Sequence, residues 1–447
     1  MEKLQSLKVS DDKRFILKKD GSPFFWLGDT TWELFHNLNK EEADLYLENR
    51  AERKFTVIQA VALAEFDGLR CGNAYERKPL LQNTNGEYDP TMPDLTKEND
   101  STYTYWDHVD YIVDKAASLG LYIGFLPTWG DKYNKCWGKG PEIFDGENAR
   151  IYGKWLGQRY KGNKNIVWIL GGDRQITTSK HFNVINEMAA GIKEGDGGNH
   201  LMTLHPAGGF SSSYHVHDEK WMDFNMIQSG HDRLNLDNYR MVSDDYAKVP
   251  VKPVLDGEPR YEDHPIGFNP VNGYFDDFDT RQAAYWSLFA GAFGHTYGHH
   301  SIWSMCTKPE DYIIMHWKDA ITRPGGNQMQ YARNLIESRS FLDRMPDQEL
   351  IAENYEGSNH LQATRGKDYV FIYSPNGLRI KVNMGRISGE NVKGYWYNPR
   401  KGSSSYLGEF SNTDVQSFVP PSSGRNNDWV LVLDNSNANY DTPGILE

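Results

Sequence analysis

The apolar residues of the first three hundred positions fall into short runs, and longer segments of helical periodicity separate these runs. Residues 165–171 contain bulky apolar side chains over a length that fits one strand buried on both faces. Similar runs lie at 24–32, 55–61, 121–129, 201–206, 224–231, 253–258 and 291–298. This pattern predicts eight strands.

Helical segments alternate with these runs. In 106–119 the apolar residues recur at the helical period until Gly120, and further helices are predicted at 39–54, 147–160, 181–193, 238–246 and 280–289. Strands and helices that alternate over roughly 250 residues or more predict an α/β fold of the TIM (β/α)8 barrel type. A doubly wound open sheet is the alternative. It is less favoured because no Gly-x-Gly-x-x-Gly follows the first strand, and because polar residues cluster at the end of nearly every strand.

The period of the pattern changes to two near the C-terminus. Short runs at 361–364, 369–373, 392–397 and 429–433 are separated by Pro, Asn and Gly residues that favour turns. The sequence therefore predicts two domains. These are a catalytic barrel over 1–345 and an accessory all-β sandwich over 346–447, which would pack on the barrel without adding a catalytic residue.

Composition and charge narrow the classes of function. The 13 Trp and 26 Tyr residues fit a sugar-binding cleft, because aromatic faces stack on the apolar faces of sugar rings. A net charge of -13 argues against nucleic acid and against anionic membranes as partners.

No apolar run reaches the roughly 18 residues of a membrane span. The first residues lack the apolar core of a signal peptide, so we expect a cytoplasmic protein or a mature chain whose export signal was removed. The oligomeric state stays open.

Two of the predicted strands end in glycine followed by an acid. The strand at 165–171 leads into Gly172 and Asp173, and the strand at 253–258 ends in Gly257 and Glu258. Because the carboxyl ends of all barrel strands meet at one face, we expect these two acids to face each other across one pocket. A pair of carboxylates fits glycoside hydrolysis, in which one protonates the leaving oxygen and the other attacks, or directs water to, the anomeric carbon. The alternative for each acid is a structural ion pair, with Arg174 for Asp173 or with Arg260 for Glu258.

Other polar and aromatic side chains stand at or just after predicted strand ends, on the face where barrel enzymes build their sites. Each of them would either contact a sugar or make a structural hydrogen bond. These candidates for substrate binding are Asp29, Trp32, Gln59, Trp129, His205, Gln228, His231 and Tyr297.

Two histidine pairs raise the alternative of a metal-dependent barrel hydrolase. They are His215 with His217, and His299 with His300. Such an enzyme would need His-x-His at the end of the first strand, where this chain has Gly28-Asp29-Thr30. We therefore expect no metal site and no cofactor. A third alternative is a carbohydrate-binding protein without chemistry, and the presence of both acids argues against it.

Several stretches together resemble one known family. They are Gly28-Asp29-Thr30-Thr31-Trp32, residues 168–173, Asp256-Gly257-Glu258 with Tyr261-Glu262, and residues 291–298. They resemble the apiosidase-like glycoside hydrolases of family 140, and the resemblance extends to a C-terminal sandwich of the kind labelled collagen-binding in that family. It implies a retaining glycosidase with Asp173 as acid/base and Glu258 as nucleophile, exo-acting on the side chains of plant polysaccharides. More distant barrel glycosidases usually carry Asn-Glu where this chain has Gly172-Asp173, so the resemblance to cellulases is weaker.

Overall fold

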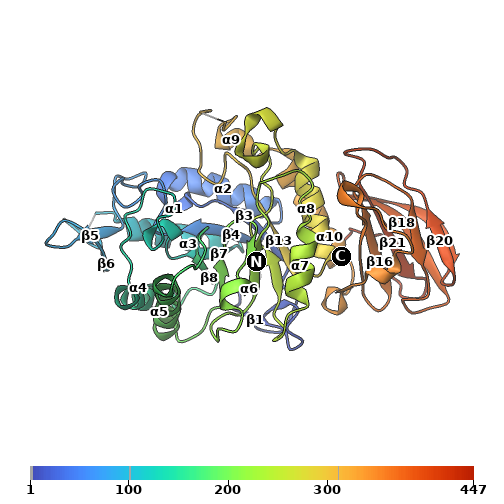
Figure 1. Cartoon of the computed structure of the whole chain (residues 1–447), viewed down its shortest axis with the longest axis horizontal. Helices are drawn as coiled ribbons and strands as arrows, with labels where there is room; N and C mark the ends of the chain where they lie inside the picture. Colours follow the sequence, from blue (N-terminus) through green and yellow to red (C-terminus); the bar gives the residue numbers. More distant parts are fainter. Residues whose placement is uncertain (1–3, 100–101, 311, 447) are drawn as a thin grey trace.

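A barrel of parallel strands forms the first and larger part of the molecule (Figure 1). The computed structural model of the chain describes residues 4–99, 102–310 and 312–446. Within these residues the parallel barrel strands are β3 (Trp26–Thr30), β4 (Val57–Val61), β7 (Tyr122–Leu126), β8 (Ile166–Gly171), β9 (Met202–His205), β11 (Asn225–Gln228), β12 (Val254–Asp256) and β13 (Gly294–Tyr297). Each of them lies inside one of the apolar runs, so the strand predictions are confirmed.

The barrel is nearly closed. Its sheet has the order β10-β11-β12-β13-β3-β4-β7-β8-β9, in which the short β10 (Phe210–Ser211) pairs antiparallel with β11. The sheet curls until β9 lies beside the start of β11, where Thr203 Oγ1 donates a hydrogen bond of 2.6 Å to Phe224 O. Alternate residues of β4, β7 and β8 belong to two different cores. Ile58, Ile123 and Trp168 pack with the helices, whereas their neighbours on the same strands pack with the residues of the other core.

The helices are α1 (Leu34–Asn37), α2 (Lys40–Glu52), α3 (Tyr105–Ser118), α4 (Gly146–Tyr160), α5 (Ser179–Asp196), α6 (Ser213–Val216), α7 (Asn238–Tyr246), α8 (Asp277–Phe289), α9 (Trp317–Ala320) and α10 (Pro324–Glu337). Four of the long ones begin at a capping box, with Asn39, Thr104, Asp145 and Asp276 as the capping residues. The predicted helices are all present. The sequence reading missed α10 and the two strands β5 (Leu80–Gln82) and β6 (Tyr88–Pro93), which form a hairpin at the end of the molecule opposite the C-terminal domain (Figure 1).

The C-terminal domain is an antiparallel sandwich, as predicted. Its large sheet has the order β14 (Met345–Pro346), β15 (Gln362–Arg365), β16 (Tyr369–Ser374), β21 (Trp429–Asn435), β18 (Asn391–Asn398) and β19 (Ser403–Ser411). A small second sheet of β17 (Ile380–Asn383) and β20 (Val415–Phe418) contributes to a separate core with the large one. At the N-terminus, β1 (Leu7–Val9) and β2 (Ile16–Lys18) form a further pair.

The large sheet uses its other face to pack on the barrel. Tyr373 stacks on Tyr285 of α8 with ring centroids 4.9 Å apart, and Phe371 stacks on Phe289 at 5.9 Å. Figure 1 shows α8 and α10 on the side of the barrel that faces this sheet. Because these aromatic rings are buried, the C-terminal domain shares a continuous apolar core with the barrel.

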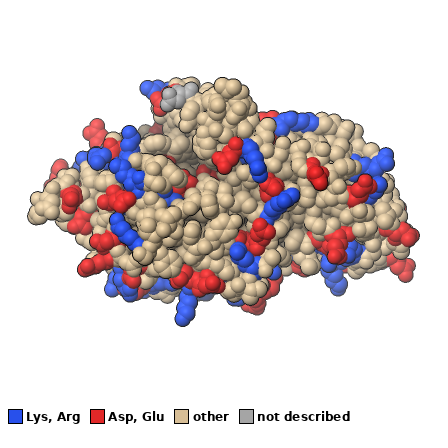
Figure 2. All heavy atoms as spheres, in the orientation of Figure 1, with Lys and Arg blue, Asp and Glu red and all other residues tan. Residues whose placement is uncertain are grey.

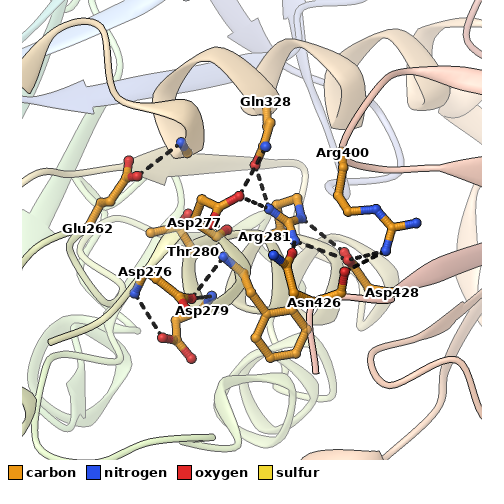
Figure 3. Close-up of polar contacts among 12 residues, drawn as sticks. Glu262, Asp276, Asp277, Asp279, Thr280, Arg281, Gln328, Arg400, Asn426 and Asp428 are labelled. Atoms are coloured by element: carbon orange, nitrogen blue, oxygen red, sulfur yellow. Dashed lines mark hydrogen bonds and ion pairs between the residues drawn. The ribbon is translucent and has the colours of Figure 1, made fainter. Parts of the chain in front are cut away.

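A buried arginine joins the two parts through charge (Figure 3). Arg281 of α8 donates from Nε and Nη2 to the two carboxylate oxygens of Asp428, at 3.0 and 3.1 Å, and both side chains are fully buried. Its Nη1 donates to Asp277 at 2.6 Å and to Gln328 of α10 at 2.5 Å. The bidentate geometry and the complete set of acceptors make this buried charge tolerable.

The surface is mixed in charge. On the face shown in Figure 2, acidic and basic side chains are interspersed over the barrel and the C-terminal domain alike. Among the described residues, none of the helices combines the length and the apolar character that a membrane crossing requires.

We expect the Asp428→Ala variant to be less stable than the wild-type protein, because Arg281 would stay buried without this acidic partner. Removing one partner of a buried ion pair lowers the free energy of unfolding by about 3–5 kcal/mol. Urea unfolding followed by circular dichroism measures the change. The control is Glu353→Ala, which removes an exposed ion pair with Lys381 in the same domain and should leave the unfolding midpoint unchanged. Equal midpoints for the two variants would contradict the role given to Arg281.

Candidate active site

A cavity of about 430 Å³ opens at the carboxyl ends of the barrel strands. Its volume falls within the range of roughly 300–1,000 Å³ that is usual for ligand pockets. Every parallel strand supplies a wall residue from its end or from the loop that follows. In strand order from β3 to β13 these are Trp32, Glu65, Trp129, Asp173, Ala207, Gln228, Glu258 and His300. The site therefore occupies the face where barrel enzymes carry out their chemistry.

The strand β8 ends in a backbone turn that brings Asp173 to the cavity. Gly171, Gly172 and Asp173 have φ angles of 91°, 104° and 57°. A Cβ atom on Gly171 would lie 2.4 Å from the carbonyl oxygen of His205, so only glycine fits there. Asp173 itself is a non-glycine residue in the left-handed region, a strained conformation that is typical of functional sites.

Burial and charge raise the pKa of the Asp173 carboxyl to about 6. Burial is the larger cause, and the negative charge of Glu258 adds to it. The predicted alternative, an ion pair with Arg174, exists only as a long contact of 3.4 Å between Arg174 Nη1 and Asp173 Oδ2. The same guanidinium makes shorter hydrogen bonds with the carbonyl oxygens of Asp173 at 2.8 Å and Trp137 at 2.9 Å. Asp173 thus remains a carboxyl that can hold a proton near neutral pH.

Two histidines hold Glu258 in its charged form. His205 Nε2 lies 2.8 Å from Glu258 Oε2, and His231 Nε2 lies 3.3 Å from Oε1. The Nδ1 atoms of these rings accept hydrogen bonds from the backbone N–H groups of Asp173 and Tyr261, at 3.2 and 3.4 Å. The proton of each neutral ring must therefore sit on Nε2, where it faces Glu258.

Burial alone would raise the pKa of Glu258, but the hydrogen bonds from His205 and His231 lower it to about 2. The other predicted alternative, a pair between Glu258 and Arg260, is not formed, because Arg260 Nη1 donates to Gln282 of α8 at 3.1 Å. The two acids of the cavity therefore have opposite protonation preferences. Such divergence is the usual sign of an acid and base pair.

The structure brings some of the predicted substrate contacts to the cavity. Trp32, Trp129, Gln228 and His231 line its wall. His205 lies behind the wall, fully buried, with its ring 5.1 Å from that of Trp32. Gln228 also donates a hydrogen bond that lowers the pKa of Asp173.

The three remaining predicted contacts, like His205, lie outside the cavity wall. Asp29 is buried against Arg50 and the hydroxyl of Tyr46. Gln59 Nε2 donates to the carbonyl oxygen of Gly257 at 3.0 Å, and the Tyr297 hydroxyl donates to Glu262 at 2.6 Å. Asp29, Gln59 and Tyr297 thus make structural hydrogen bonds, which was one of the two alternatives that the sequence left open for each residue.

Sequence reasoning missed several wall residues because they stand in loops beyond the strand ends, where no period locates them. They are Glu65, Trp137, Gln175, Asp232, His264, Phe268, Trp303 and Tyr312. His300, considered above only as half of a histidine pair, also belongs to the wall. The ring of His264 lies 4.3 Å from the rings of both His231 and His300, so three imidazoles form one side of the cavity.

Polar atoms in this wall lack partners within the described chain. They include Trp129 Nε1, Gln228 Oε1 and His300 Nε2, and each belongs to a residue that is less than one-tenth exposed. Leaving such groups unpaired is unfavourable, which makes them ready to bind the hydroxyl groups of a ligand.

The histidine pairs are engaged separately. His217 contacts Asn225 Oδ1 at 3.1 Å, whereas His299 Nε2 contacts Asp263 at 3.0 Å. In the described parts of the chain, no group of three or more His, Cys, Asp or Glu side chains is arranged to hold a metal ion.

Comparison with known proteins assigns the chain to a family. The family model described as "Apiosidase-like, catalytic domain" matches residues 10–343. The chain belongs to the apiosidase-like glycoside hydrolases. The model described as "Putative collagen-binding domain of a collagenase" matches residues 345–434. No curated protein matches the chain.

The solved structures that this chain resembles are also glycoside hydrolases. One described as a glycoside hydrolase has 36% sequence identity and a TM-score of 0.87, with 98% of each chain covered. A family 5 glycoside hydrolase from Bacteroides vulgatus has 35% identity and a TM-score of 0.89, and 98% of this chain and 94% of that chain are covered. The enzyme is therefore a glycosidase, and the alternative of a carbohydrate-binding protein without chemistry is set aside.

We expect the Asp173 carboxyl to titrate near pH 6 in the wild-type protein, and at a lower pH in the Glu258→Gln variant. The pKa should fall because the negative charge of Glu258 is lost, yet it should stay above the ordinary 3.8 because burial persists. The measurement is a ¹³C NMR titration of carboxyl-labelled aspartate, with the Asp173 signal assigned by its loss in Asp173→Asn. Glu187→Gln on the surface of α5 is the control. If the pKa of Asp173 were the same in the wild-type protein and in Glu258→Gln, the two carboxyl groups could not face each other across one cavity.

Proposed function

We propose that this glycosidase works by a retaining double displacement, with Asp173 as acid/base and Glu258 as nucleophile. The observation that carries the proposal is the divergence of the two carboxyls in one cavity. The pKa of Glu258 is lowered to about 2, so it is charged and able to attack the anomeric carbon. The pKa of Asp173 is raised to about 6, so it can carry the proton that the leaving oxygen needs.

His205 is the positioning residue of this mechanism. Its Nδ1 accepts from the backbone of Asp173 while its Nε2 faces Glu258. In the first step Glu258 bonds to the anomeric carbon while the proton of Asp173 moves to the leaving oxygen. In the second step Asp173 takes a proton from water, whose oxygen attacks the anomeric carbon and releases Glu258.

For the substrate we propose terminal sugars of plant polysaccharide side chains, apiosyl units first among them, removed in an exo manner. The apiosidase-like match over residues 10–343 supports the sugar. Walls contributed by all of the barrel strands support a pocket that takes a chain end.

We place the boundary between the catalytic and the accessory domain at 345/346. The cavity wall named here ends at Tyr312, which supports a structural role for the second domain.

The Glu258→Gln variant should lose turnover on every substrate, on the order of 10⁴-fold or more, because the nucleophile takes part in both steps. Asp173→Ala should lose activity on natural oligosaccharides and keep the first step on an activated aryl glycoside, whose leaving group needs little protonation. Added azide should then rescue the second step and give a glycosyl azide. Burst kinetics and product analysis by NMR measure both effects.

The pH profile supplies the control within the same experiment. For the wild-type enzyme, kcat/KM on an apiosyl oligosaccharide should fall above about pH 6, where Asp173 loses its proton. On the activated aryl glycoside the Asp173→Ala variant should lose this limb. If Asp173→Ala lost activity equally on both substrates and gave neither a burst nor an azide product, Asp173 would have a structural role in its contact with Arg174 and no role as acid/base.

A further inference from the structure

The loop between β7 and α4 carries a tryptophan at the mouth of the cavity. Trp137 lines the cavity and its side chain is 54% exposed. The guanidinium of Arg174 lies 4.1 Å from the centre of the indole, so one face of the ring is covered by a cation. The rest of the indole is open, and because Trp137 lines the cavity, its free ring surface is available to a ligand bound there.

Trp137 is held in place by Arg174, a residue outside its own loop. Arg174 Nη2 donates to the carbonyl oxygen of Trp137 at 2.9 Å, and Arg174 Nε donates to that of Asn134 at 3.1 Å. Asn134 Nδ2 in turn donates to the carbonyl oxygen of Gln175 at 3.0 Å. The ring and the backbone of Trp137 are thus fixed by the same fully buried arginine, so little side-chain freedom is lost on binding a ligand.

The arginine also sets where Trp137 stands relative to the reaction. Arg174 follows Asp173 in the chain and donates to the carbonyl oxygen of Asp173 at 2.8 Å. Asp173, Arg174 and Trp137 therefore form one continuous series of contacts. In a glycosidase the acid must lie beside the leaving oxygen, so the surface attached to the acid belongs to the leaving group. The three imidazoles form a different wall, on the side of His231 and Glu258.

We infer that Trp137 is a stacking platform for the sugar ring that leaves, next to the scissile bond. This inference rests on the proposed function. It specifies the substrate class, because the platform selects glycosides whose leaving group is a saccharide with an apolar ring face over those with a small leaving group.

Two substrates with one glycosyl unit and different leaving groups test the platform. They are a plant oligosaccharide that ends in an apiosyl unit and apiosyl fluoride, whose leaving atom is too small to reach Trp137. The Trp137→Ala variant should lower kcat/KM on the oligosaccharide on the order of tenfold to a hundredfold and leave the fluoride reaction unchanged. Trp137→Phe, which keeps a ring, should restore most of the oligosaccharide activity. The control is Phe268→Ala, which removes an aromatic side chain of similar exposure, 55%, beside His264. It should not distinguish the two substrates.

Binding gives a second readout that does not need turnover. Calorimetry should show that Trp137→Ala binds the oligosaccharide fragment left after apiosyl removal more weakly than the wild-type protein, with free apiose bound equally by both. Unchanged kcat/KM on the oligosaccharide would overturn the platform. An equal loss on both substrates would also overturn it, because the tryptophan would then act through Arg174 on Asp173. A wild-type enzyme that hydrolyses neither substrate would instead overturn the proposed function, and the platform with it.

Discussion

A charge buried at the end of β12 is the constraint on which the rest of the site depends. A carboxylate taken out of water is stable only if hydrogen bonds replace its hydration. Two histidines hold Glu258: His231 Nε2 is hydrogen-bonded to Oε1 at 3.3 Å, and His205 Nε2 lies in contact with Oε2 at 2.8 Å. Each ring has the correct tautomer only because a backbone N–H donates to its Nδ1 atom. The turn that presents Asp173 is therefore also the turn that fixes the proton of His205. The same buried charge helps to keep Asp173 protonated, so the environments of the two acids are set together.

The C-terminal domain is connected to this arrangement through one helix. Two neighbouring residues of α8 have partners in different parts of the molecule. Arg281 pairs with Asp428 of the sandwich, and Gln282 accepts a hydrogen bond from Arg260 in the loop after β12. Arg260 stands two residues beyond Glu258. The apolar contacts of Tyr285 and Phe289 with the large sheet continue along the same helix. The sandwich thus buttresses the helix that supports the loop of Glu258, which explains how a domain outside the cavity wall can matter to the fold of the site.

The cavity combines a polar floor with an aromatic mouth. Several buried polar atoms of its wall have no partner among the described residues, whereas its rim carries exposed rings such as Trp137 and Phe268. Sugars present this combination, since hydroxyl groups surround rings with apolar faces. Both features are costly to leave exposed or unpaired, and a bound saccharide would relieve both at once.

The barrel and the positions of its two acids at strand ends could be predicted from the order of residues along the chain. Strands buried on both faces need continuous apolar runs, and the turn after β8 needs Gly171 and Gly172. Both features depend on residues that are adjacent in the sequence, so a local pattern reveals them. Tertiary structure decided which of the other polar residues reach the cavity. A residue at a strand end points either to the cavity or into the barrel wall, and its distant partner decides which. Asp29 is held by Arg50, twenty-one positions away, and Tyr297 by Glu262. Trp137 and Glu65 reach the cavity from loops without any period, because their positions depend on contacts with segments distant in sequence, which no local pattern encodes.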